Sequence, residues 1–297
     1  MISIVITAYN VSQYIEEAIR SALGQTHKDI EVIVVLDKPT DDTADIVKRI
    51  AEEDERVRIV ENKENVGAGL SRRYGIEEAK GEYVLLLDGD DYLKPDFIEV
   101  LYDKALETDA DIVTGCISIL REDGTQDITL YGDCVLTGYD KITKFWGTRI
   151  VYINNRLIRR SMYDLVPYCH RRYIEDTPVI IPLLWYANKV AFINYAGYVY
   201  RMQEDSLTHK NNPIQDFIYK SLCWCDLVEF FNEHDKAFFD VYPIRETIRE
   251  TLGFLNSNTL SVDAIAPYAN EWAELTLRMF NLIKITGIDF KQPNAKE

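Results

Sequence analysis

The stretch Gly81-Glu-Tyr-Val-Leu-Leu-Leu-Asp-Gly-Asp-Asp-Tyr-Leu-Lys-Pro95 decides how the rest of the chain is interpreted. The uninterrupted apolar run of residues 83–87 predicts a buried strand. That strand ends on three carboxylates, Asp88, Asp90 and Asp91, and the final proline favours the first turn of a helix. Carboxylates held this close favour a hard divalent cation with oxygen ligands. A solvated Asp-Gly turn is the alternative interpretation.

Strands alternate with helices along the first 120 residues. Apolar runs predict strands at residues 2–8, 30–36, 57–60, 82–87 and 112–120, and helical spacing predicts helices at 11–23, 44–51, 67–79 and 96–107. Strands that alternate with helices require crossover connections, which predicts an α/β fold with a mostly parallel sheet flanked by helices.

The second half of the chain has a different pattern. Residues 121–135 are polar and contain glycine, which is typical of a hairpin or an excursion. After Pro213 the apolar residues return at helical spacing. We therefore expect one domain at 1–210, with halves at 1–120 and 121–210, and a helical C-terminal extension at 211–297.

The composition limits the kinds of partner. A formal net charge of −16 in 297 residues argues against a nucleic acid as the main partner, although a metal can bridge acidic side chains and a nucleotide diphosphate. Five scattered cysteines indicate reduced thiols. No signal peptide or apolar run of 18 residues is recognisable. We expect a soluble cytoplasmic protein, and leave open peripheral contact with the inner face of the membrane and a homo-oligomer.

Polar residues follow several of the early strands. The carboxyl ends of parallel strands meet at one edge of a sheet, so these residues would converge on one crevice. Asp37 can accept a hydrogen bond from a nucleotide base, and Tyr9 can stack on or flank that base. One carboxylate after Leu87 can hold a ribose hydroxyl while another holds a metal ion that neutralises a diphosphate.

The same segments resemble the amino-terminal half of family-2 glycosyltransferases of the GT-A fold. The resemblance covers residues 2 to about 100 and is carried by Ile4-Val-Ile-Thr-Ala-Tyr-Asn10, Ser21-Ala-Leu-Gly-Gln-Thr26, Glu31-Val-Ile-Val-Val-Leu-Asp37, Thr40-Asp-Asp-Thr43, Asn65-Val-Gly67, Ser71-Arg-Arg-Tyr-Gly75 and the stretch quoted first. It implies a GT-A fold, Mn²⁺ or Mg²⁺, and inverting transfer of a sugar from a nucleotide-diphosphate sugar. A UDP-sugar is the family's commonest donor. By analogy, the acceptor is a glycan or glycolipid in cell-surface polysaccharide biosynthesis.

The resemblance continues more loosely to about residue 210. It is carried by Tyr152-Ile-Asn-Asn-Arg-Leu-Ile-Arg-Arg160, Tyr173-Ile-Glu-Asp-Thr177, Tyr198-Val-Tyr-Arg201 and Ser206-Leu-Thr208. It implies that Asp176 is the catalytic base, with Glu175 as its neighbour or substitute.

The resemblance assigns roles to the remaining candidates. Nucleotide-binding residues would be Thr7, Ala8, Tyr9, Asp37, Arg72, Asp88 and Gly89. Metal ligands would be Asp90, with Asp88 and His209 as further candidates, and contacts to phosphate or acceptor would be Arg156, Arg201, Ser206 and Lys210. Surface charge is the alternative explanation for each basic residue.

The chain departs from the family pattern at two places, and two other functions remain as alternatives. Lys38-Pro39 and Arg72-Arg73 replace residues that are common in the family, which leaves the donor open. A sugar nucleotidyltransferase is disfavoured because Thr7-Ala-Tyr-Asn10 is not a glycine-rich basic loop. A non-catalytic scaffold that retains the fold is the other alternative.

Overall fold

A computed structural model of the protein describes residues 1–121, 123–128, 132–147, 152–171, 173–202, 213–235 and 266–286. The chain forms two compact units, Met1–Ser206 and Leu207–Glu297, and each is described by itself. The sequence analysis placed a boundary after residue 210, four residues beyond this division.

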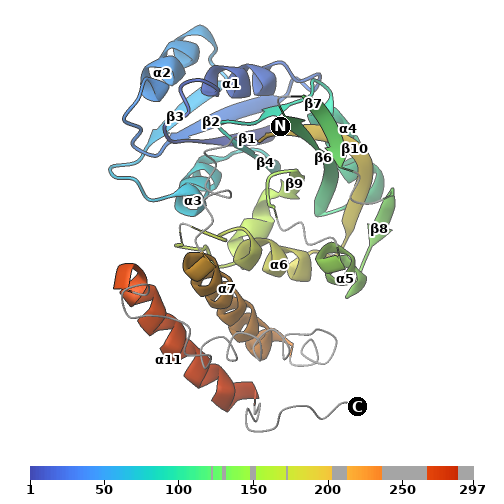
Figure 1. Ribbon diagram of the computed structural model, residues 1–297. Coiled ribbons are helices and arrows are strands. Elements are labelled where there is room, and N and C mark those ends of the chain that lie inside the picture. Colours follow the sequence, from blue (N-terminus) through green and yellow to red (C-terminus); the bar gives the residue numbers. More distant parts are fainter. Residues whose placement is uncertain are drawn as a thin grey trace. The chain divides into compact units, whose positions relative to one another are not determined.

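In the first part of the first unit, strands alternate with helices, whereas in its second part several strands follow one another directly (Figure 1). Its first part contains β1 (Ile2–Ala8), α1 (Ile15–Leu23), β2 (Ile30–Leu36), α2 (Thr43–Glu53), β3 (Val57–Glu61), α3 (Ala68–Glu78), β4 (Tyr83–Asp88), β5 (Tyr92–Leu93) and α4 (Phe97–Thr108). Its second part contains β6 (Ile112–Arg121), β7 (Gly124–Ile128), β8 (Cys134–Leu136), α5 (Asp140–Gly147), β9 (Arg156–Arg159), the 3₁₀ helix η1 (Arg160–Leu165), α6 (Thr177–Tyr186) and β10 (Val190–Arg201).

One mixed sheet runs through the whole first unit, with strand order β3-β2-β1-β4-β9-β6-β10-β5. β3, β2, β1 and β4 are parallel to one another. β9 lies between β4 and β6 and is antiparallel to both, whereas β10 is parallel to β6. The predicted mostly parallel α/β fold is therefore confirmed, with one short reversed strand inside the sheet.

Helices cover both faces of the sheet because its strands are apolar on both sides. All seven residues of β2 are buried, as expected for a central parallel strand. Alternate residues of a strand face opposite sides: Ile4 packs in one core cluster with Ile19 of α1 and Leu101 of α4. Val5, on the other face, lies against Gly75 of α3. This arrangement leaves the carboxyl ends of β1, β2 and β4 at one edge.

The hairpin that was expected after residue 121 is present as the antiparallel pair β6 and β7. β10 is then anchored against α4 by a close contact, because an added Cβ at Gly197 would lie 2.2 Å from Phe97 Cδ2. Phe97 itself is fully buried. The contact fixes the strand segment that carries Tyr198, whose side chain reaches the candidate site.

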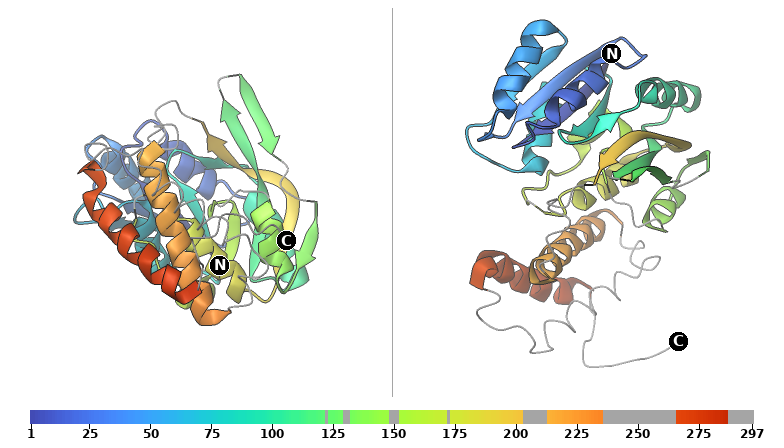
Figure 2. Two further views of the ribbon diagram at one scale, coloured as in Figure 1. Left: turned by 60° about the horizontal axis from the view of Figure 1, so that its bottom comes forward. Right: turned by 45° about the horizontal axis from the view of Figure 1, so that its top comes forward.

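The second unit contains α7 (Pro213–His234), the short 3₁₀ helix η3 (Ala266–Tyr268) and α11 (Ala269–Thr286). α7 and α11 lie side by side (Figure 2), in the part of the chain where helical structure was predicted. Cys225 Sγ lies 3.8 Å from Met279 Sδ in their interface, and Arg278 donates hydrogen bonds to Asp226 and Glu229. Cys225 is thus a packing residue between the two helices.

Among the described helices, none has the length and apolar character needed to cross a bilayer.

We predict that Gly197→Ala lowers the free energy of unfolding by about 1–3 kcal/mol, because the added methyl group forces the ring of Phe97 or the β10 backbone to shift. Chemical denaturation checks this result. Gly132→Ala is the matched control, since its added Cβ meets no atom within 4 Å. Equal stability of the two variants would contradict the assigned packing.

Candidate active site

The carboxyl ends of β1 and β4 are joined by short contacts. Thr7 pairs with Asp88 in the parallel register, and its hydroxyl donates to Asp88 Oδ1 over 3.4 Å. The N–H of Gly89 donates to Thr7 O at 3.0 Å, and a Cβ on Gly89 would lie 2.7 Å from that oxygen. Ala8 O accepts the N–H of Asp37 at 3.0 Å. The predicted convergence of these residues is present, while their binding of a nucleotide stays a prediction.

Asp37 is buried at the end of β2 and organises the loop that follows β3. Its Oδ1 accepts from Asn62 Nδ2 (2.9 Å) and Val66 N (2.8 Å), and its Oδ2 accepts from Gly67 N (2.9 Å). An ionised carboxylate offers about four lone-pair sites, so it can accept one further donor. Tyr9, 47% exposed, stands at the end of β1.

The residues after β4 form a tight turn instead of a continuing strand. Asp91 N donates to Asp88 O at 3.0 Å, so the chain turns directly after β4. Asp91 turns inward and is 2% exposed. Its carboxylate accepts from Tyr198 Oη (2.6 Å) and Arg201 N (2.8 Å), while Arg201 Nε donates to the Asp90 carbonyl at 3.0 Å.

Asn154 and Tyr198 belong to this network but had no role in the sequence analysis. Asn154 donates to Asp88 Oδ2 at 2.5 Å and to Tyr198 Oη at 3.3 Å. Asn154 and Tyr198 both lie in segments that carry the resemblance. Neither is an acidic or basic residue, which is the kind that motif searches favour. For Tyr198 the available signal was the alternation of Tyr198 and Tyr200, which places both side chains on one face of β10.

The carboxylates after β4 fit part of a divalent-cation site. Burial, and then the charge of Asp88, raises the pKa of Asp90 to about 6, so a buried negative charge here favours a compensating cation. Carboxylate oxygens are the donors that Mg²⁺ and Mn²⁺ prefer. In the part of the chain that the structure describes, no group of three or more Asp, Glu, His or Cys forms a complete site. Asp88 and Asp90 would therefore supply only some of the ligands, and phosphate oxygens would supply others.

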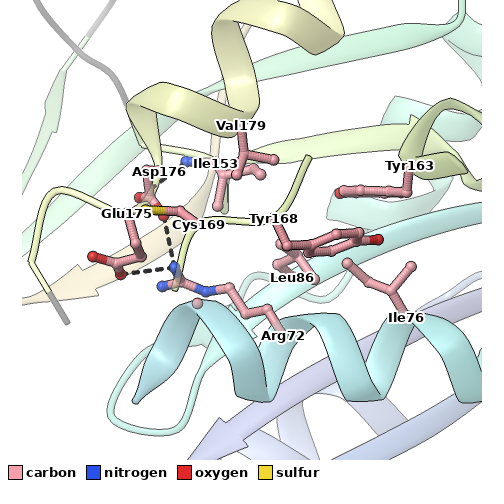
Figure 3. Close-up of a pocket in the computed structure, with 11 residues that line it drawn as sticks. Arg72, Ile76, Leu86, Ile153, Tyr163, Tyr168, Cys169, Glu175, Asp176 and Val179 are labelled. Atoms are coloured by element: carbon pink, nitrogen blue, oxygen red, sulfur yellow. Dashed lines mark hydrogen bonds and ion pairs between the residues drawn. The ribbon is translucent and has the colours of Figure 1, made fainter. Parts of the chain in front are cut away.

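Arg72 connects this edge of the sheet to the segment before α6. Figure 3 shows its contacts with Glu175 and Asp176. Its Nη2 donates to Asp88 Oδ1 at 2.9 Å. Its Nη1 donates to Glu175 Oε1 at 3.0 Å and to Asp176 Oδ1 at 2.6 Å. The side chain is only 9% exposed, so its charge is used inside the protein. The predicted contact of Arg72 with a nucleotide stays a prediction.

The backbone brings Glu175 and Asp176 to Arg72 through a constrained turn. Ile174 has φ of +55°, a left-handed conformation that is an outlier for a β-branched residue and is often found at functional sites. A Cβ on Gly69 would lie 2.8 Å from Cys169 O and 3.3 Å from Glu175 Cβ, so only glycine admits this close approach to α3. Asp176 precedes α6 and its Oδ2 accepts the N–H of Ile153 at 3.4 Å.

The two adjacent carboxyl groups hold protons more tightly than usual. Burial, and then the charge of Asp176, raises the pKa of Glu175 to about 7. Burial also raises the pKa of Asp176, although Arg72 opposes that shift. Near neutral pH, Glu175 can therefore be protonated, while Asp176 makes the shorter hydrogen bond to Arg72. Two environments for two carboxyl groups can separate a base from its neutral partner.

A small pocket lies beside this cluster, between α3 and α6 (Figure 3). Its lining consists of Gly69, Arg72, Ile76, Leu86, Ile153, Tyr163, Tyr168, Cys169, Glu175, Asp176 and Val179. Arg72 Nε and Tyr163 Oη are buried and make no hydrogen bond to the described part of the chain. A ligand oxygen or an ordered water in the pocket could satisfy such donors.

The remaining predicted residues divide into two groups. Arg156 is 1% exposed and its guanidinium donates to Tyr152 O and Asn155 Oδ1, so the side chain is used internally and contact with phosphate or acceptor stays a prediction. Ser206, His209 and Lys210 lie outside the described residues. Arg73, beside Arg72, pairs with Glu77 at 2.6 Å and lies over the Tyr168 ring.

Comparison with known proteins gives the family. The profile described as "Glycosyl transferase family 2" matches residues 3–166, more than half of the chain. The chain belongs to glycosyltransferase family 2, and the resemblance inferred from its motifs is confirmed.

Curated relatives and a solved structure agree with this assignment. The chain is 30% identical over 245 residues to glycosyltransferase GlyG of Streptococcus pneumoniae, covering 78% of this chain and 79% of GlyG. It is 36% identical over 125 residues to the putative teichuronic acid biosynthesis glycosyltransferase TuaG of Bacillus subtilis, covering 42% and 50%. The structure of S. aureus TarS residues 1–349 in complex with UDP-GlcNAc superposes with a TM-score of 0.67 at 17% identity, covering 96% of this chain and 83% of that one. This likeness confirms the GT-A fold.

We predict that Arg72→Met lowers the free energy of unfolding by about 3–5 kcal/mol at neutral pH, because three carboxylates lose their buried counter-charge. Arg73→Met, the neighbouring and more exposed arginine, should cost about 1 kcal/mol or less. Urea denaturation of both variants checks the difference. Similar losses of stability in the two variants would show that Arg72 stabilises the protein no more than an ordinary surface ion pair does.

We predict that the free energy of unfolding of the wild type falls relative to that of the Glu175→Gln variant as the pH rises from 4.5 to about 7. The ordinary pKa of 4.5 is raised to about 7 in the folded protein, so the folded state binds this proton more tightly and loses that stabilisation on deprotonation. Urea denaturation across pH 4.5–8 provides the measurement. Glu52→Gln, an exposed change on α2, is the control, and its free energy of unfolding should depend on pH as that of the wild type does. The same pH dependence in Glu175→Gln would refute the raised pKa of Glu175.

Proposed function

We propose that this protein is a metal-dependent inverting glycosyltransferase that moves a sugar from a nucleoside-diphosphate sugar to a hydroxyl of a glycan or glycolipid. The observation that carries the proposal is the Arg72 cluster. One guanidinium bonds the carboxylate at the end of β4 and the candidate base before α6. A base held this close to the donor edge is what a single displacement requires.

The donor half of the site would use residues at the ends of β1, β2 and β4. Asp37 has one acceptor position left for a base N–H, and Tyr9 is exposed beside it. Asp88 would hold the ribose or a water, and Asp90 would be the first metal ligand. A bound Mn²⁺ or Mg²⁺ would neutralise charge on the diphosphate. The complex of TarS with UDP-GlcNAc, a protein of the same fold, supports a uridine nucleotide as the donor.

The reaction would proceed by transfer of one proton and one glycosyl group. Asp176 takes the proton of the acceptor hydroxyl, and the acceptor oxygen bonds to the anomeric carbon as the bond from that carbon to the diphosphate oxygen breaks. The diphosphate leaves with the electron pair. Arg72 holds Asp176 in its charged form, while Glu175 is the neutral neighbour. The name of the relative TuaG supports a surface polysaccharide as the product, and action at the cytoplasmic face of the membrane is part of this proposal.

We predict that Asp176→Asn retains binding of nucleotide and loses sugar transfer by roughly 10²–10⁴-fold, because only the proton acceptor is removed. Thermal unfolding with UDP and GDP, each with and without Mn²⁺, measures binding. A nucleotide at ~100 times its Kd should add roughly 2.7 kcal/mol of stability. Product formation from UDP-sugars measures transfer.

Two variants complete this experiment. Asp90→Asn should lose the Mn²⁺-dependent stabilisation, and Asp103→Asn, an exposed change on α4, should behave as the wild type. Absence of stabilisation by every nucleotide would favour the non-catalytic scaffold. Full transfer activity in Asp176→Asn would remove Asp176 as the base.

A further inference from the structure

Two tyrosines beside the candidate base form an aromatic pair to which no role has been assigned. The rings of Tyr152 and Tyr200 are stacked, with centroids 6.4 Å apart and planes 16° from parallel. Tyr152 is 46% exposed, so part of its ring is open to solvent. An aromatic face held in place and open to solvent is suited to contact a ligand.

Residues next to the pair in sequence belong to the hydrogen-bond network of the site. Tyr152 directly precedes Ile153, whose N–H bonds Asp176, and Asn154, which bonds Asp88. Tyr200 follows Tyr198 by two residues on β10 and shares its face of the strand. The platform formed by Tyr152 and Tyr200 therefore borders the base.

The topology separates this platform from the predicted nucleotide site. Asp37 and Tyr9 end β2 and β1, which lie on one side of β4 in the strand order. Tyr200 is on β10 and Tyr152 precedes β9, and both strands lie on the other side of β4. A donor whose base contacts Asp37 enters from the first side. The side of β4 that carries β9 and β10 is then left for the acceptor, next to Asp176.

We propose that Tyr152 and Tyr200 bind the acceptor by stacking against one face of a saccharide ring, so that a ring hydroxyl meets Asp176. This inference rests on the proposed function and specifies its acceptor as a sugar. Pyranose rings present a face of C–H groups with slight positive charge, which complements the negative face of an aromatic ring. Their equatorial hydroxyls stay free to reach polar partners. The nearby carboxyl groups disfavour an anionic group at the same position.

The kinetic test uses three tyrosine variants and a saccharide panel. The acceptors are the methyl β-glycosides of glucose, galactose and N-acetylglucosamine and the corresponding disaccharides, and release of UDP is measured with and without acceptor. Tyr152→Ala and Tyr200→Ala should raise the acceptor KM by about tenfold or more, and this change should exceed any change in the rate of donor hydrolysis by water. Tyr152→Phe should retain most of the acceptor affinity. Tyr74→Ala, a change of an exposed tyrosine on α3, is the matched control.

A binding measurement keeps the inference testable without any activity. Tyr152→Trp introduces an indole at the platform, and the same saccharides are titrated while its emission is compared with that of the wild type. A saturable change specific to the variant supports the platform. No change with any saccharide, or a Tyr152→Ala variant that loses donor hydrolysis and transfer equally, overturns it. Failure of the proposed function would show instead as absent nucleotide binding, which this titration does not require.

Discussion

The site depends on a single buried guanidinium. Arg72 is the positive charge that lets Asp88, Glu175 and Asp176 approach one another inside a largely buried space. Without it, desolvation and mutual repulsion would raise the pKa of Glu175 and of Asp176 further, because Arg72 opposes both shifts. The same three contacts fix the distance between the end of β4 and the start of α6. Electrostatics and geometry at this site are therefore set by one residue.

The backbone around the cluster is arranged to allow that contact. Gly69 removes a side chain where the segment of residues 169–175 crosses α3, and Ile174 accepts a left-handed conformation immediately before the two carboxyl residues. Both features carry a conformational cost that ordinary packing does not require. Their place beside Arg72 indicates that the local sequence serves the site more than the stability of the fold.

Much of the fold could be predicted from the sequence because its central strands are unbroken apolar runs. The run that ends at Asp88 marks both the strand and the edge where ligands bind in open α/β sheets. Glu175 and Asp176 were found through the family resemblance, since an acidic pair before a proline is also an ordinary helix start. The contacts of Arg72 with Glu175 and Asp176 could not be predicted, because these two partners lie about 100 residues away in sequence and local patterns hold no information on such contacts. Asn154 and Tyr198 were missed for the same reason.

The position of the short strand β9 in the sheet limits which segments of this protein can be exchanged in evolution. Its four residues complete the hydrogen bonding of β4 on one side and β6 on the other, although it follows both in the chain. If the chain were cut after the first 120 residues, β4 would keep an open, fully apolar edge, and such edges promote aggregation. The strands of residues 1–120 are thus not a portable module. Recombination that exchanges the second half of this unit would have to keep β9 with the first half or supply a compatible replacement.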